Sequence, residues 1–143
     1  EAEAEQPLAA RGKLSALIDA MKTILSDRVV DVRESKRLIE SPAALVNPQE
    51  GATAGIQKLL SLVNKDFVMS KRILEVNGRS PILTNLAEIH HLEPGSKLVE
   101  QAAHQLLDNA MLLEGLPVSP ETMVPRIQQL LEELTRAKSK PSD

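Results

Sequence analysis

Three histidines, His90, His91 and His104, have the widest chemical range in this sequence, because an imidazole can ligate a metal or act as a base. His90 and His91 are adjacent, so they point to different sides of a helix or strand, and His104 is distant in the sequence. The chain has no cysteine, and no two histidines have the spacing of neighbours on a helical face. The pattern therefore predicts no metal site.

Nucleophilic catalysis would need a serine, a histidine such as His91 or His104, and a carboxylate such as Asp108. A serine of that kind sits on a sharp, glycine-flanked turn between a strand and a helix, and no segment has this pattern. The glycine spacing also matches neither a dinucleotide fingerprint nor a P-loop. We therefore predict no catalytic and no cofactor-binding residue. A small hydrolase using His91 or His104 is kept as a third class of function.

The elements that would position a site must be built from aliphatic side chains, because Phe67 is the only Phe, Tyr or Trp residue. Apolar residues recur at the spacing of an amphipathic helix until about Ser26, which predicts a helix with one buried face. Its apolar positions are Leu14, Leu17, Ile18, Met21 and Leu25.

Three short strands are predicted from β-branched residues and turn signals. They are Arg28–Leu38, Ala43–Val46, and Ile73–Val76, the last of which stops at the turn dipeptide Asn77-Gly78. The chain is thus expected to be α+β, with a small three-stranded sheet packed with helices.

A helix is predicted from about Ala52 to Asn64, between the second and third strands. It carries an apolar stripe, and Lys58 is the only full charge between Gly51 and Asn64. Such a stripe can be core or an exposed patch that binds other proteins, and the residues alone favour neither. The stripe consists of Ile56, Leu59, Leu60 and Val63.

The last third of the chain is predicted to be helical. A short helix opens at Ser80-Pro81, a longer one starts after Ser96 and ends at Gly115, and a final one follows Ser119-Pro120. Pro125 has no N–H to donate and is unfavourable inside this last helix, so the helix should start near Thr122 or bend.

The last two helices form a hairpin whose apolar faces are too broad to be enclosed by the hairpin alone. The surplus must meet the α/β body or a second copy, and a two-fold four-helix bundle in a homodimer is the simplest closed solution. The predicted interface residues are Leu106, Ala110, Leu113, Met123, Ile127, Leu130 and Leu134.

The predicted organisation is one domain over residues 13–136, with an α/β body at 13–92 and the dimerisation hairpin at 96–136. Residues 1–12 are expected to be a flexible lead or linker, and residues 137–143 a disordered tail. The sequence starts with an acidic, alanine-rich lead and not with Met, so we expect it to be part of a longer chain.

Charge and hydropathy exclude several partners. Lys and Arg number 17 against 20 Asp and Glu, giving a net charge of -3, and stacking platforms for bases are missing, so no nucleic acid is expected. No apolar run approaches the roughly 18 residues of a membrane span, so no membrane is expected. The lack of cysteine and of a signal-peptide pattern favours the cytoplasm.

Three segments of the sequence have a distinctive pattern. They are LSDRVVDVRESKRL at 25–38 with Ser41-Pro42-Ala43, ILEVN at 73–77 with Pro81-Ile82, and LLDNA at 106–110 through Gly115. These segments resemble the C-terminal domain of the ninety-kilodalton heat-shock chaperones, and the resemblance covers about Leu14 to Leu134. The departures are Gly78, where the family usually has proline, and Ser80, where it usually has histidine.

The resemblance implies constitutive homodimerisation of an ATP-dependent molecular chaperone. The ATPase, with its ATP and magnesium, would lie in an N-terminal domain outside this sequence, so this chain itself is not expected to be an enzyme. The resemblance also implies that the helix at 52–64 contacts unfolded or partly folded client proteins through Ile56, Leu59, Leu60 and Val63.

The C-terminal sequence KSKPSD at 138–143 lacks the Met-Glu-Glu-Val-Asp motif that eukaryotic cytosolic members use for co-chaperones. This points to a bacterial or an organellar member, and of the two we expect a bacterial member in the cytoplasm. The alternative function is a free-standing helical adaptor that dimerises and recruits a partner.

Overall fold

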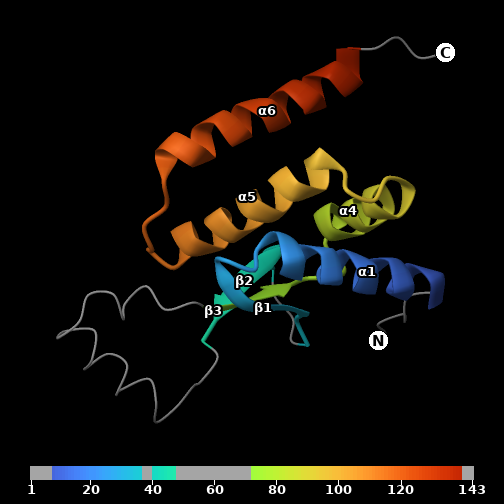
Figure 1. The fold of residues 1–143 in the computed structure, drawn as a ribbon, viewed down its shortest axis with the longest axis horizontal. Coiled ribbons are helices and arrows are strands. Elements are labelled where there is room, and N and C mark those ends of the chain that lie inside the picture. The colour runs from blue at the N-terminus through green and yellow to red at the C-terminus, as the bar shows by residue number, and fades with distance from the viewer. Residues whose placement is uncertain (1–7, 37–39, 48–71, 140–143) are drawn as a thin grey trace.

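The computed structural model describes residues 8–36, 40–47 and 72–139, and these form an α+β fold (Figure 1). The predicted fold class is therefore confirmed. The helix predicted at 52–64 and its stripe of Ile56, Leu59, Leu60 and Val63 lie outside the described residues. In chain order the elements are α1 (Leu8–Ile24), β1 (Val29–Glu34), β2 (Ala43–Val46), β3 (Arg72–Val76), α4 (Pro81–Leu92), α5 (Lys97–Leu113) and α6 (Pro120–Ser139).

The three strands form one mixed sheet in the order β1-β3-β2. The central strand β3 pairs in parallel with β1 and antiparallel with β2. The prediction that the first strand runs to Leu38 was wrong, because β1 ends at Glu34. Glu34 is paired with Val76, the last residue of β3, so residues 35 and 36 extend past the end of the partner strand.

The apolar core lies between the sheet and the helices α1, α4 and α5. The predicted stripe of the first helix is confirmed: its residues are buried, apart from Ile18, which is partly buried against the core. The sheet contributes Val32, Leu74 and Val76. From α4 and α5 the core takes Leu83, Leu86, Ala87, Val99, Ala103, Leu106, Leu107 and Ala110.

The helix ends follow the predicted signals. The Ser80 and Ser96 hydroxyls cap α4 and α5 by accepting hydrogen bonds of 3.2 Å from the N–H groups of Ile82 and Leu98. Gly115 follows the end of α5 with a φ of 74°, a left-handed conformation that glycine adopts without a steric penalty.

Three helix boundaries differ from the predicted segments. Helix α1 starts at Leu8, inside the segment expected as a lead, because the alanines that follow are strong helix formers. Helix α6 starts at Pro120 instead of near Thr122, runs through Pro125, and ends at Ser139. In the described ranges, none of the helices has the length and hydropathy needed to cross a membrane.

We predict that Leu17→Ala lowers the free energy of unfolding by about 2–5 kcal/mol, because the mutation removes a fully buried side chain and leaves a cavity. Leu92→Ala is the matched control, since Leu92 is largely exposed and its loss should change stability by less than about 0.5 kcal/mol. Urea unfolding of both variants measures the difference. Equal losses would contradict this position of the core.

Candidate functional site

Helix α6 is the outermost element and runs back along α5 as the second arm of a hairpin (Figure 1). All of its residues are described, and Arg126 is the only buried one. In contrast, α5 buries five apolar residues and Asp108. The hairpin therefore has one helix that belongs to the core and one that contributes no buried apolar side chain.

The exposed apolar residues of the hairpin form what we call the outer apolar face. On α6, Leu131 is 53% exposed and Leu134 is 57% exposed, and at the end of α5 Leu113 is 73% exposed. The face consists of Leu112, Leu113, Val124, Leu131 and Leu134.

The structure separates the residues predicted for a dimer interface into three groups. Leu106 and Ala110 are buried in the core of the single chain. Leu113 and Leu134 belong to the outer apolar face, and the remaining three, Met123, Ile127 and Leu130, are half-buried.

Leu112, Val124 and Leu131 also belong to this face but were not among the predicted interface residues. Leu131 had been recognised on the apolar face of the last helix, and the seven-residue step from Val124 to Leu131 was the signal that could have identified Val124.

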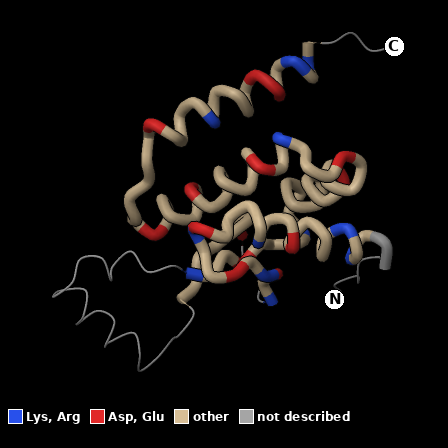
Figure 2. Tube along the Cα trace, in the orientation of Figure 1, with Lys and Arg blue, Asp and Glu red and all other residues tan. Residues whose placement is uncertain are grey.

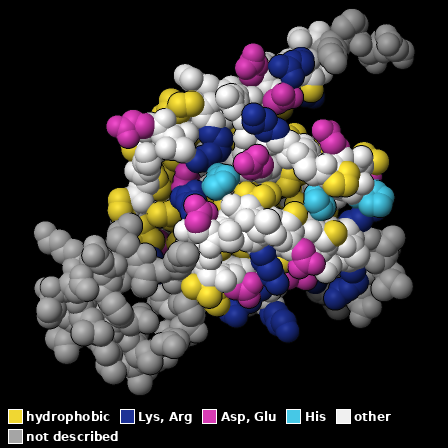
Figure 3. All heavy atoms as spheres, viewed as in Figure 1, with side chains coloured by type: hydrophobic (Ala, Val, Ile, Leu, Met, Phe, Trp, Pro, Cys, Tyr) yellow, Lys and Arg dark blue, Asp and Glu magenta, His cyan; other side chains and the backbone are white. Residues whose placement is uncertain are grey.

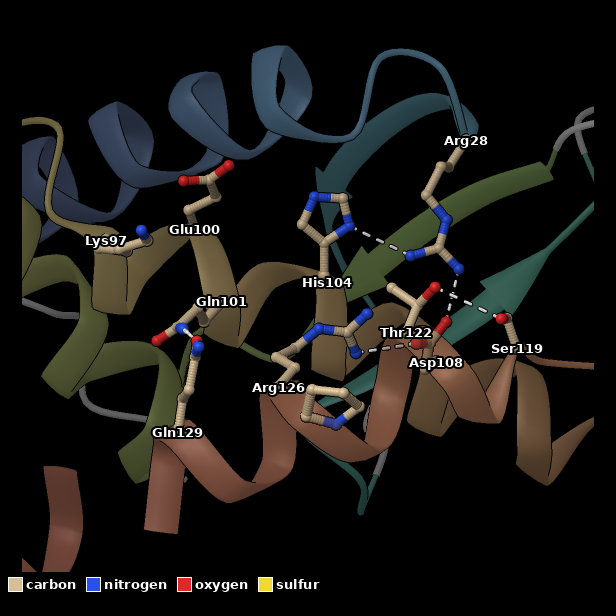
Figure 4. Close-up of a pocket in the computed structure, with 11 residues that line it drawn as sticks. Arg28, Lys97, Glu100, Gln101, His104, Asp108, Ser119, Thr122, Arg126 and Gln129 are labelled. Atoms are coloured by element: carbon tan, nitrogen blue, oxygen red, sulfur yellow. Dashed lines mark hydrogen bonds and ion pairs between the residues drawn. The ribbon is translucent and has the colours of Figure 1, made fainter. Parts of the chain in front are cut away.

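A buried ion cluster connects α6 to the rest of the chain (Figure 4). Asp108 on α5 is 3% exposed and accepts from two guanidinium groups. The Arg28 Nη2, from the turn between α1 and β1, lies 2.5 Å from Asp108 Oδ1, and the Arg126 Nη1, from α6, lies 2.8 Å from Oδ2. One carboxylate therefore joins three elements that are separate in the sequence.

Other contacts between α5 and α6 are also polar. Arg126 Nη1 donates to Gln105 Oε1 at 3.0 Å, and Gln101 Nε2 donates to Gln129 Oε1. The ends of α6 are matched to its helix dipole, with Glu121 in the first turn and basic residues in the last (Figure 2). Helix α6 is thus oriented mainly by hydrogen bonds and charge.

His104 is held in one protonation state by the same cluster. Its Nδ1 lies 3.1 Å from Arg28 Nη1, and because a guanidinium has only donors, Nδ1 must accept and the ring must be neutral. Burial lowers the pKa of His104 most, the charges of Arg28 and Arg126 lower it further, and Glu100 and Asp108 oppose them. The triad geometry considered for a hydrolase differs, because there Nδ1–H donates to the carboxylate.

A pocket of about 500 Å³ opens between α5 and α6 at this cluster. Histidine, basic and acidic side chains crowd together on this face of the molecule (Figure 3). The pocket is lined by Arg28, Lys97, Glu100, Gln101, His104, Asp108, Ser119, Thr122, Pro125, Arg126 and Gln129 (Figure 4).

The three histidines do not form a common site. His90 and His91 lie on α4 and His104 lies on α5. Within residues 8–36, 40–47 and 72–139, no three His, Asp or Glu side chains are grouped so that they could hold a metal ion.

Comparison with known proteins gives matches over most of the chain. The family model described as Hsp90 protein matches residues 1–142. The chaperone protein HtpG of Oleidesulfovibrio alaskensis is 42% identical over 125 residues, which cover 87% of this chain and 20% of that protein. HtpG of Chlorobaculum tepidum is 39% identical over 140 residues, covering 96% of this chain and 22% of that protein. The chain therefore spans about a fifth of the length of the curated relatives it matches.

We predict that His104 makes the stability of the chain fall in mild acid. Its pKa in the folded chain is below the ordinary value of 6.5, so the unfolded chain takes up the proton first. The contribution of neutral His104 to the free energy of unfolding is fully present above about pH 6.5, and it is lost as the pH falls from there toward the lowered pKa.

Urea unfolding at about pH 7.5 and about pH 5.5 measures this loss. His104→Asn keeps an acceptor for Arg28 but cannot titrate, so it should lose less stability between the two pH values than the wild type does. His91→Asn, at an exposed position on α4, should behave like the wild type. An unchanged pH dependence in His104→Asn would show that this histidine is not responsible.

Proposed function

This chain belongs to the Hsp90 protein family, and we propose that it is the dimerisation domain of a longer bacterial chaperone. The observation that carries the proposal is the state of α6, a helix of 20 residues with no buried apolar side chain in the single chain. An apolar face of this kind on a soluble domain usually marks a protein interface.

A second copy of the chain is the partner that fits this face best. Hairpins from two copies can pack about a two-fold axis as a four-helix bundle, which buries the same face on both. Stable interfaces bury roughly 1,200–2,000 Å² in total, an area that two long hairpins can supply. The polar contacts of α6 with α5 support this arrangement, because they turn Arg126 toward α5 while Leu131 and Leu134 stay exposed.

Client binding is the second part of the proposed function. We assign it to the apolar stripe of residues 52–64, named above, which lies outside the described residues. Burial of apolar surface gives about 25 cal/mol per Å² without a fixed geometry, so a stripe of this kind can bind many unfolded segments. Two copies in a dimer would add avidity.

ATP hydrolysis is assigned to another part of the longer protein, since this chain covers only about a fifth of its relatives. The chain would then act without its own cofactor. We place the protein in the bacterial cytoplasm, because its relatives are bacterial HtpG chaperones.

We predict that Leu134→Asp converts the dimer to a monomer. Burying an unpaired carboxylate in the interface would cost several kcal/mol, whereas in the single chain this position is exposed and tolerates a charge. Light scattering at micromolar concentration should give twice the chain mass for the wild type and one chain mass for the variant.

Gln129→Glu is the control, because it also adds one negative charge on α6, at an exposed position whose neighbours three and four residues away do not belong to the outer apolar face. It should remain a dimer. A monomeric wild type, or a Leu134→Asp variant that is still dimeric, would reject dimerisation through this face.

We further predict that replacing both Leu59 and Leu60 with Ser in the full-length protein weakens its suppression of client aggregation. The melting temperature should stay near that of the wild type, because the two side chains are proposed to contact clients and not the core. If the substitutions instead unfold the protein, the stripe is core and the assignment is wrong.

A further inference from the structure

The buried ion cluster carries one more positive charge than its carboxylate neutralises. Arg28 and Arg126 share Asp108, and the side chains of Arg126 and Asp108 are only 9% and 4% exposed. His104 does not change this sum, because its ring is neutral and its Nδ1 accepts a hydrogen bond from Arg28. A buried charge without a counter-charge is costly, and two guanidinium groups on one carboxylate repel each other.

The surplus charge faces the pocket between α5 and α6. The hydrogen bonds of Arg126 leave from Nη1, and its Nε and Nη2 have no hydrogen-bond partner in the described part of the chain. The side chains of Arg28, His104, Asp108 and Arg126 point toward one another at this pocket (Figure 4). Strong donors are therefore available on a nearly buried cation.

The other lining residues do not cancel this charge. Glu100 and Lys97 also line the pocket, and both are exposed, so their opposite charges roughly balance. The hydroxyls of Ser119 and Thr122, at the start of α6, are hydrogen-bonded to each other at 3.3 Å, so one of the two O–H groups remains to donate into the pocket.

We propose that this pocket binds a compact oxyanion, either inorganic phosphate or the phosphate group of a small phosphomonoester, with Arg126 as its main contact. Guanidinium groups suit this ligand because their forked donors match phosphate oxygens. A pocket of about 500 Å³ leaves room for more than the phosphate group itself. The bound anion would neutralise the surplus charge and tie α6 to the body. The inference goes beyond the proposed function and does not rest on it.

Thermal melting of the full chain tests the proposal, with sodium chloride used to keep the ionic strength constant. Excess phosphate should raise the melting temperature by about 2–4 °C over chloride alone, as expected for a ligand that binds only the folded state. Titration calorimetry with inorganic phosphate and with phenyl phosphate distinguishes the two sources, since the tighter ligand identifies the one for which the pocket is built.

Two isosteric variants provide the decisive comparison. Gln129→Glu places a carboxylate in the pocket and keeps the acceptor for Gln101, so phosphate affinity should fall on the order of tenfold or more. Gln128→Glu makes the same change of charge one residue away, outside the pocket lining, and should bind like the wild type.

Arg126→Met should abolish the phosphate response, and the glutamine pair decides the question even if that variant does not fold. The proposal is overturned if phosphate stabilises the chain no more than chloride does. It is also overturned if Gln129→Glu and Gln128→Glu respond equally to phosphate.

Discussion

The carboxylate of Asp108, shared by Arg28 and Arg126, is the interaction on which the arrangement of the hairpin depends. It joins α6 to α5 through a buried charge-assisted hydrogen bond, and α5 to the turn before β1 through a part-buried one. Such bonds are stronger than neutral ones. Removing one partner of such a pair typically costs about 3–5 kcal/mol, because the other is left buried and unpaired. The cluster therefore favours one orientation of α6 over others that apolar packing alone would allow.

The rest of the molecule supports this cluster and follows from it. The sheet and the helices α1, α4 and α5 supply a closed apolar core, so α5 offers α6 a rigid surface on which Asp108 has a fixed position. Arg126 and Gln129 of α6 contact α5, and Leu131 and Leu134 are left exposed. The polar contacts between α6 and α5 within one chain thus leave apolar side chains of α6 exposed for contact with a second chain.

Local signals made much of the fold predictable, while the ion cluster depended on distant residues. The stripe of α1 and the caps Ser80 and Ser96 are set by neighbours within a few residues. The end of β1 was not predictable, because it is fixed by the length of its partner strand. Arg28 and Asp108 are 80 positions apart, so their pairing leaves no periodic signal, and the only chemical role predicted for Asp108 was that of a catalytic carboxylate.

Thiol reactivity tests most directly whether the outer apolar face is the seam between two copies. The chain has no cysteine, so Leu131→Cys and Glu132→Cys each introduce a single thiol at an exposed position of α6, the first on the outer apolar face and the second turned away from it by about 100° around the helix. We expect the Leu131→Cys thiol to react slowly at high protein concentration and faster on dilution, while the Glu132→Cys thiol reacts fast throughout. Equal and fast reaction of both thiols at every concentration would contradict dimerisation through this face.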